Sequence, residues 1–168
     1  MKSLTFIRHA KSDWGNEFLK DIDRPLAERG YQDAYDLSTW FLKTHSQPDL
    51  IVSSTATRAL NTALIFARTF NFDLTNFKLD DKIYESSGKN LLSIISKLPN
   101  QKKAIMLFGH NPSFTNICNE LTDDLFFENV PTCGIISLQF DIKSWEEVPT
   151  KKAKINFHQF PKDYKNND

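Results

Sequence analysis

The chain has 168 residues, of which 40% are hydrophobic and 25% are charged, which is ordinary for one globular domain with a single core. Its 21 Lys and Arg residues balance 21 Asp and Glu residues, so no excess charge favours nucleic acid or a membrane surface. No apolar run approaches the ~20 residues of a membrane span, and the N-terminal run is too short for a signal-peptide core. Cys118 and Cys133 are too few for a disulfide framework, so we expect a cytoplasmic protein.

Apolar runs and helical periodicities alternate along the chain. Strands are expected at 4–8, 50–53, 104–109 and 135–140, with weaker candidates at 77–79 and 153–157. Apolar residues at helical spacing predict helices over 28–44 and 56–70, and two more are expected at 87–98 and 111–121. Ser87 is suited to cap the third helix, and Asn111 followed by Pro112 is typical of a helix start.

This alternation predicts an α/β fold in which helices flank a mostly parallel sheet. The last two strands have no helical segment between them, which favours an antiparallel edge. One domain over residues 1–160 accounts for all these elements. The remaining residues, 161–168, form a polar tail that we expect to be mobile.

Arginines and histidines follow three of the expected strands. Arg8 and His9 end the first strand, Arg58 comes just past the second, and His110 follows the strand at 104–109. Ligands of open α/β sheets bind outside the carboxyl ends of the strands, so these side chains are expected to share one phosphate pocket. A guanidinium can hold a phosphoryl group through two hydrogen bonds, and a neutral imidazole beside it can act as a nucleophile.

Other chemistries fit the sequence less well. The five glycines form neither a dinucleotide-binding fingerprint nor a Walker loop, and neither cysteine is followed six residues later by the arginine of a cysteine-phosphatase loop. The four histidines show no i,i+4 pair and no His-x-His, so we expect no metal site and no cofactor. Taken singly, Arg8 would be a surface arginine, and His45 and His158 are expected to be structural or exposed.

Four segments, in this order along the chain, resemble motifs of the histidine phosphatase superfamily. They are Arg8-His9-Ala10-Lys11-Ser12, Asp23-Arg24-Pro25-Leu26 with Glu28-Arg29-Gly30, Ser54-Thr55-Ala56-Thr57-Arg58-Ala59, and Gly109-His110-Asn111-Pro112. Within that superfamily the chain looks like the small SixA-type branch, the phosphohistidine phosphatases. The resemblance runs from the first strand to about Gly134 and departs at Ala27, where similar proteins often carry Ser or Thr as the helix cap.

The resemblance implies a phosphoglycerate mutase-like three-layer sandwich and a phosphatase that needs no metal. It also implies that His9 is the nucleophile and becomes phosphorylated, while Arg8, Arg58 and His110 bind the phosphoryl group. Larger relatives use a carboxylate after the third strand as general acid, and Glu85 is the matching candidate. The alternative is that Glu85 is an exposed carboxylate near a helix start, where its charge suits the helix dipole.

Two aspartates beside these motifs have more than one interpretation. Asp13 and Asp23 could orient Lys11, Arg24 or Arg58, or the pairing of Asp23 with Arg24 could be purely structural.

The expected pocket is shallow, because one helix uses most of the roughly two dozen residues between the strand at 77–79 and Ala104 and leaves little chain for a lid. A shallow pocket suits a phosphorylated side chain of a protein, above all phosphohistidine, or another exposed phosphomonoester. The expected partner is therefore a phosphorylated protein or a small phosphomonoester, and neither nucleic acid nor a membrane. The alternatives are a general phosphomonoesterase or a mutase of the same superfamily, and an inactive phosphate-binding module.

Overall fold

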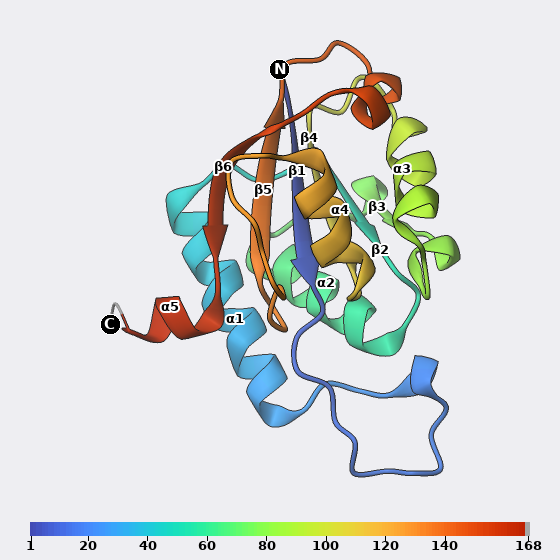
Figure 1. The fold of residues 1–168 in the computed structure, drawn as a ribbon. Helices are drawn as coiled ribbons and strands as arrows, with labels where there is room; N and C mark the ends of the chain where they lie inside the picture. Colours follow the sequence, from blue (N-terminus) through green and yellow to red (C-terminus); the bar gives the residue numbers. More distant parts are fainter. Residues whose placement is uncertain (167–168) are drawn as a thin grey trace.

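A computed structural model describes residues 1–166, which form a six-stranded sheet with helices on both faces (Figure 1). The strands are β1 (Lys2–Arg8), β2 (Leu50–Ser53), β3 (Phe77–Leu79), β4 (Ala104–Gly109), β5 (Ile135–Phe140) and β6 (Lys154–Gln159). The helices are α1 (Glu28–Thr44), α2 (Thr57–Thr69), α3 (Gly88–Ser96), α4 (Ser113–Leu121) and α5 (Pro161–Asn166). Short 3-10 turns are η1 (Asp21–Asp23), η2 (Leu74–Asn76), η3 (Asp81–Ile83) and η4 (Trp145–Thr150).

The strand order across the sheet is β3-β2-β4-β1-β5-β6. Strands β3, β2, β4 and β1 are parallel, whereas β5 runs antiparallel to β1 and β6 antiparallel to β5. The predicted mostly parallel sheet with an antiparallel edge is therefore confirmed. In the register Arg8 lies opposite Gly109, and Ser53 lies opposite Phe108. The carboxyl ends of β1, β2 and β4 consequently meet at one edge of the sheet.

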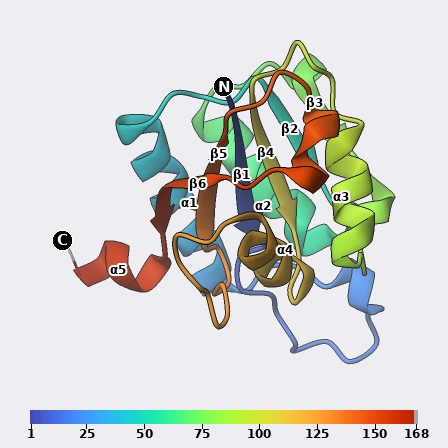
Figure 2. The ribbon, with the colours of Figure 1, turned by 45° about the horizontal axis from the view of Figure 1, so that its top comes forward.

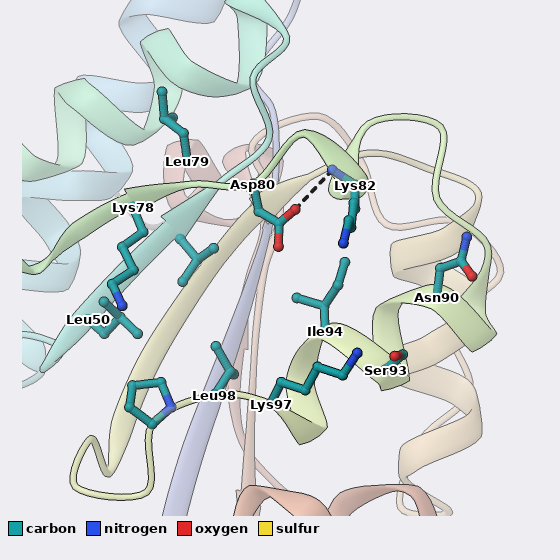
Figure 3. Close-up of a pocket in the computed structure, with 12 residues that line it drawn as sticks. Leu50, Lys78, Leu79, Asp80, Lys82, Asn90, Ser93, Ile94, Lys97 and Leu98 are labelled. Carbon is teal, nitrogen blue, oxygen red and sulfur yellow. Dashed lines mark hydrogen bonds between the residues drawn. The ribbon is translucent and has the colours of Figure 1, made fainter.

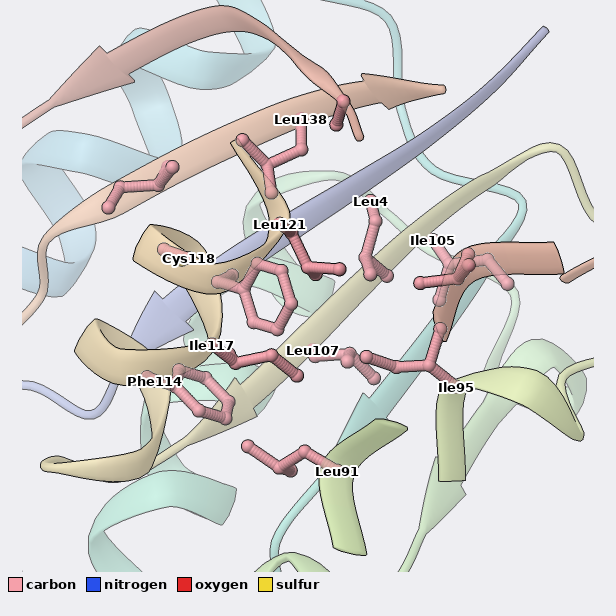
Figure 4. Close-up of a cluster of buried hydrophobic side chains, with 14 of the residues drawn as sticks. Leu4, Leu91, Ile95, Ile105, Leu107, Phe114, Ile117, Cys118, Leu121 and Leu138 are labelled. Atoms are coloured by element: carbon pink, nitrogen blue, oxygen red, sulfur yellow. The ribbon is translucent and has the colours of Figure 1, made fainter. Parts of the chain in front are cut away.

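Two hydrophobic cores lie on opposite faces of the sheet. Helices α3 and α4, with η4, cover one face, and α1 and α2 cover the other (Figures 1 and 2). Figure 4 shows the first core, where Leu91 of α3 and Phe114 of α4 lie close to strand residues such as Leu4 and Leu107. Alternate side chains of a strand point to opposite faces, so Leu4 enters this core while Ile7 enters the other. Fully burying a side chain of this size stabilises the fold by about 1.5–3 kcal/mol.

Most element boundaries follow the predicted ones, and the exception is the start of α4. Ser87 caps α3 as expected, because its hydroxyl accepts a hydrogen bond from the Asn90 backbone N–H at 3.2 Å. Asn111 is expected as the cap and Pro112 as the first helical residue, whereas α4 begins one residue later, at Ser113, with Pro112 at the N-cap. The Asn111 Oδ1 still accepts a hydrogen bond from the Thr115 N–H in the first turn at 3.3 Å, and its amide group donates to the Val130 carbonyl at 3.0 Å in the loop before β5.

The last described segment is a short helix. Residues Pro161–Asn166, predicted as part of a polar tail, form α5, and Lys165 makes an ion pair of 2.7 Å with the fully buried Asp33 of α1. Residues 167 and 168 of that predicted tail lie outside the described residues. Within residues 1–166, no helix is long and apolar enough to cross a membrane.

A close backbone approach holds the loop that follows β1 against the start of α1. A Cβ added to Gly30 would lie 2.1 Å from the Lys11 carbonyl oxygen, so only glycine fits there. The Lys11 carbonyl also accepts a hydrogen bond from the Ala27 N–H at 2.9 Å. Ala27 is the N-cap of α1 and supplies no side-chain hydrogen bond, so this backbone contact is what anchors the helix start.

Candidate active site

The carboxyl ends of β1, β2 and β4 bring the predicted histidines and arginines together. His9 is the first residue past β1, and its backbone N–H donates to the Gly109 carbonyl at the end of β4 over 2.9 Å. The rings of His9 and His110 have centroids 5.2 Å apart. Arg58, in the first turn of α2, donates from Nε to His9 Nε2 at 3.3 Å. All three residues are buried.

The orientation of His9 follows from its two ring nitrogens. Nδ1 lies 2.8 Å from the Ala10 carbonyl oxygen, which can only accept, so Nδ1 carries the proton. Nε2 is therefore unprotonated, and its lone pair accepts the hydrogen bond from the Arg58 Nε–H. The next peptide is fixed as well, because the Ala10 N–H donates to the Thr62 hydroxyl of α2 at 3.0 Å. The imidazole is thus held in the tautomer that leaves Nε2 available as a nucleophile.

The surroundings of His9 keep its imidazole neutral. Burial, followed by the charges of His110, Arg58 and Arg8, lowers the pKa of His9 from 6.5 to about 3, although the Ala10 hydrogen bond acts in the opposite direction. A neutral imidazole near pH 7 retains the lone pair that nucleophilic attack requires.

His110 offers an unpartnered donor toward the same place. The Ser54 hydroxyl accepts from the Ala56 N–H at 3.2 Å, so its own hydrogen is available for His110 Nε2, which lies 2.8 Å away. With Ser54 as the donor, His110 carries its proton on Nδ1, and this nitrogen is buried and has no partner within residues 1–166. Burial, followed by the charges of Arg58 and Arg8, lowers the pKa of His110 to about 4, against the charge of Asp21.

Arg8 supplies a second unpartnered donor. Its Nη1 donates to the Val130 carbonyl at 2.8 Å, while its Nε is buried without a partner among the described residues. Burial lowers the pKa of Arg8 below its usual value, yet a guanidinium keeps its charge under all ordinary conditions. A buried unpaired donor costs about 1–3 kcal/mol, so Arg8 Nε and His110 Nδ1 together indicate a place for an anion.

Asp21 fixes Arg58, and sequence reasoning missed it. Arg58 Nη1 donates to the Asp21 carbonyl at 2.7 Å and Nη2 to its carboxylate at 3.0 Å. Nη1 and Nη2 are thereby held on Asp21, and Nε is the nitrogen that faces His9. Arg24 adds a second ion pair to the same carboxylate at 3.0 Å, and the Tyr84 hydroxyl donates to it at 2.6 Å.

These hydrogen bonds shift the pKa values of both partners. The Tyr84 bond, followed by Arg58 and Arg24, lowers the pKa of Asp21 to about 2. The same bond to Asp21 raises the pKa of Tyr84 to about 12. Asp21 is therefore an anion, and Tyr84 a neutral donor, throughout the pH range in which proteins normally work.

Further contacts hold Arg24 and Tyr84 in place. Its Nη1 donates to the Ser12 hydroxyl at 2.9 Å, and its guanidinium lies 3.4 Å from the centre of the Trp14 ring. The Tyr84 ring meets the His110 ring edge-on, with centroids 5.6 Å apart.

The other predicted site residues lie at the margin or outside. Glu85 directly follows Tyr84 but is exposed, and in the described part of the chain its carboxylate makes no hydrogen bond or ion pair. Asp13 accepts from the Gly15 N–H at 2.7 Å within its own loop, and Asp23 is exposed. Asp21, rather than Asp13 or Asp23, is thus the aspartate that orients Arg24 and Arg58.

Backbone strain gathers around the site. Three non-glycine residues among those described have positive φ, and two of them, Glu85 at 54° and Cys133 at 61°, adjoin the cluster. The Cys133 N–H donates to the carbonyls of Arg8 and His9 at 3.0 and 3.1 Å. The turn at Cys133 thus holds the backbone that carries the predicted nucleophile.

The arrangement offers no obvious metal ligands. Across residues 1–166, no group of three or more His, Cys, Asp or Glu side chains is placed to hold a metal ion. Metal independence stays a prediction.

The fold is a phosphoglycerate mutase-like α/β fold. A buried histidine and two arginines lie near the carboxyl ends of its parallel strands, one arginine on β1 and one in the first turn of α2. Residues 4–91 match the family described as the histidine phosphatase superfamily (branch 1). The chain belongs to the histidine phosphatase superfamily.

Two relatives are similar in sequence to this protein over most of the chain. An uncharacterized chloroplastic protein of Arabidopsis thaliana is 30% identical over 154 residues, which is 87% of this chain and 70% of the relative. An uncharacterized protein of Mycobacterium tuberculosis is 28% identical over 162 residues, which is 90% of this chain and 98% of the relative.

Solved structures place the fold close to SixA proteins. A candidate phosphohistidine phosphatase SixA from Agrobacterium tumefaciens has a TM-score of 0.81 and 26% identity, covering 95% of this chain and 98% of that one. A protein histidine phosphatase SixA complexed with tungstate also has a TM-score of 0.81, at 16% identity, covering 96% and 98%. The likeness to this second structure concerns the fold.

Lowering the pH should destabilise the fold through the two buried histidines. Unfolded histidines bind protons near pH 6.5, whereas folded His9 and His110 bind them only near pH 3 and 4, so the free energy of unfolding should fall as the pH drops from 6.5 toward 4. His9→Gln removes one of the two groups that take up a proton on unfolding. The free energy of unfolding of this variant should therefore fall less steeply, by up to about 1.4 kcal/mol per pH unit.

Equilibrium urea unfolding between pH 8 and pH 4 measures this difference. Above pH 7 the free energy of unfolding should change with pH equally in the wild type and in His9→Gln, and this range is the internal control. Equal slopes below pH 6.5 would show that burial does not keep His9 neutral.

Proposed function

We propose that this protein is a metal-independent phosphatase that works through a phosphohistidine intermediate on His9. Its substrate is phosphohistidine on a protein or another exposed phosphomonoester. The observation that carries the proposal is an unprotonated Nε2 on His9, facing Arg58 Nε, in one cluster with buried nitrogens of Arg8 and His110 that have no partner among the described residues. A neutral nucleophile beside donors that lack an acceptor suits a phosphoryl group.

In the first step, His9 Nε2 attacks phosphorus and the bond from phosphorus to the leaving group breaks on the opposite side. The proton stays on Nδ1 and is donated in a hydrogen bond to the Ala10 carbonyl, which stabilises the positive charge that develops on the ring. Arg8 Nε and His110 Nδ1 donate to the equatorial oxygens with little reorganisation, because the fold already holds them without partners. Arg58 Nε transfers its hydrogen bond from His9 Nε2 to a phosphoryl oxygen as Nε2 attacks. In the second step, water attacks phosphorus, the nitrogen–phosphorus bond breaks, and His9 is restored as inorganic phosphate leaves.

The comparisons support the phosphoryl chemistry. The protein from Agrobacterium tumefaciens carries the SixA description at 26% identity over nearly its whole length. The SixA structure with tungstate holds an oxyanion, as the proposed pocket would. The exposure of the cluster's margin suits this substrate class, because the side chain of Asp21, which pairs with Arg58, is 49% exposed.

His9→Ala should abolish turnover without unfolding the protein, since only the nucleophile is lost. Rapid quench of the wild type with labelled substrate should give a label on His9 that is acid-labile and base-stable. The assay runs with excess chelator, which should leave wild-type turnover unchanged. His158→Ala, an exposed histidine elsewhere, serves as the control. Label on serine or cysteine, or a requirement for added metal, would overturn the mechanism.

Asp21→Asn should lower kcat by roughly 10–100-fold, because Arg58 loses the anion that aims its Nε at His9. The matched control is Asp23→Asn, which changes an exposed carboxylate in the same turn. Hydrolysis of an aryl phosphate by the two variants gives the comparison. If Asp23→Asn is impaired as much as Asp21→Asn, the turn as a whole matters rather than the ion pair.

Glu85 is proposed as the general acid that protonates the leaving group. It follows Tyr84, and an exposed side chain at the mouth can reach a substrate without a preformed partner. Glu85→Gln should then slow hydrolysis of alkyl phosphates by the ~10²–10⁴-fold typical of acid–base catalysis, and that of aryl phosphates far less, because a phenolate leaves unaided. A small and equal effect on both esters would make Glu85 a surface carboxylate.

A further inference from the structure

A second cavity lies away from the histidine cluster, beside the β3 edge of the sheet. Its volume is about 370 Å³, and it opens between β2, β3 and α3 (Figure 3). The lining includes Leu50 and Val52 of β2, which are almost fully buried, and Ile94 and Leu98 from α3 and just beyond it. The floor is therefore apolar, and the volume is at the lower end of the range for small-molecule pockets.

Lysines surround this apolar floor. Lys78 of β3, Lys82 of η3 and Lys97 at the end of α3 all line the cavity. Their ammonium groups have no hydrogen-bond or ion-pair partner among residues 1–166. In Figure 3 the side chains of Lys82 and Lys97 extend into the space beside Ile94.

The charge of the lysines is not compensated within the cavity. Asp80 is the one acidic side chain among the lining residues, and one of its oxygens already accepts the Lys82 backbone N–H at 2.9 Å. Three cations against one carboxylate leave a local positive excess in a chain whose formal net charge is zero. A bound anion would offset that excess. Asn90 and Ser93 at the rim add polar groups that can hydrogen-bond to it.

We propose that this cavity binds a small amphipathic organic anion. The apolar part of the ligand lies on the floor formed by Leu50, Val52, Ile94 and Leu98, and its anionic group is held by Lys82 and Lys97. Lys78 adds to the positive field. A cationic wall above an apolar floor favours such a molecule over a neutral apolar one and over a bare inorganic anion.

The cavity is separate from the proposed catalytic site. None of its lining residues makes a hydrogen bond or ring contact with His9 or His110 in the part of the chain that the structure describes. Ile83 of η3 is buried and packs toward Gly109, where an added Cβ would lie 2.9 Å from its side chain. The inference therefore does not depend on the phosphatase activity.

The probe for the test is 8-anilino-1-naphthalenesulfonate, an aromatic anion whose fluorescence rises in an apolar site. One probe per folded wild-type chain is expected, with affinity that falls as salt is added. The double variant Lys82→Gln, Lys97→Gln should raise its Kd at least ten-fold. The matched double variant Lys43→Gln, Lys162→Gln changes two exposed lysines elsewhere and should bind as the wild type does.

Two further measurements keep the outcome decisive. His9→Ala should bind the probe unchanged, and vanadate should not displace it. On the wild type, amide resonances of residues 78–82 and 90–97 should shift during the titration, which needs no variant to fold. Undiminished binding by Lys82→Gln, Lys97→Gln, equal loss in the control pair, displacement by vanadate, or shifts elsewhere would each overturn the proposal.

Discussion

The Asp21 carboxylate is the interaction on which the geometry of the site depends. It accepts hydrogen bonds from Arg58 of α2, from Arg24 of its own loop and from Tyr84 beyond η3. Three segments that are distant in the sequence are thereby tied to one anion. Because Asp21 holds Nη1 and Nη2 of Arg58 through its carbonyl and its carboxylate, the guanidinium is oriented with Nε facing His9. A single carboxylate thus sets the direction of the cation that the proposed mechanism needs.

The same site is electrostatically costly in its free state. Arg8 and Arg58 are held near two buried imidazoles, and two donor groups in the cluster have no partner. Such an arrangement is unfavourable for folding and favourable for binding an anion, since donors that already face the oxyanion require no reorganisation. The apolar cores on both sides of the sheet contribute the stability that offsets this cost.

The strands and the four basic site positions were predictable because they share one signal. A buried parallel strand is a short apolar run, and the polar residue after it must lie at the carboxyl edge of the sheet. Arg8, His9, Arg58 and His110 all follow such runs or open the next helix. Their positions could therefore be inferred without knowing any contact, although their roles stay predictions.

Asp21, Tyr84 and Arg24 could not be found in this way. They lie in 3-10 turns and loops, where no periodicity relates sequence position to direction. The loop before α1 carries aspartates at 13, 21 and 23, and only the path of η1 decides which one faces Arg58. Likewise, Asn111-Pro112 predicts the start of α4 one residue early: the Asn111 side chain contacts both the Thr115 N–H and the Val130 carbonyl, and the helix begins at Ser113.

The N-terminal strand is central in the sheet, and this has a consequence for synthesis of the chain. Both neighbours of β1 come late, β4 about a hundred residues on and β5 later still, so neither face nor edge of β1 can be completed early. At the usual ~5–20 residues per second of translation, its apolar side chains wait on the order of ten seconds for partners. During that interval both edges of the strand lack their native partners, which exposes the nascent chain to non-native strand pairing.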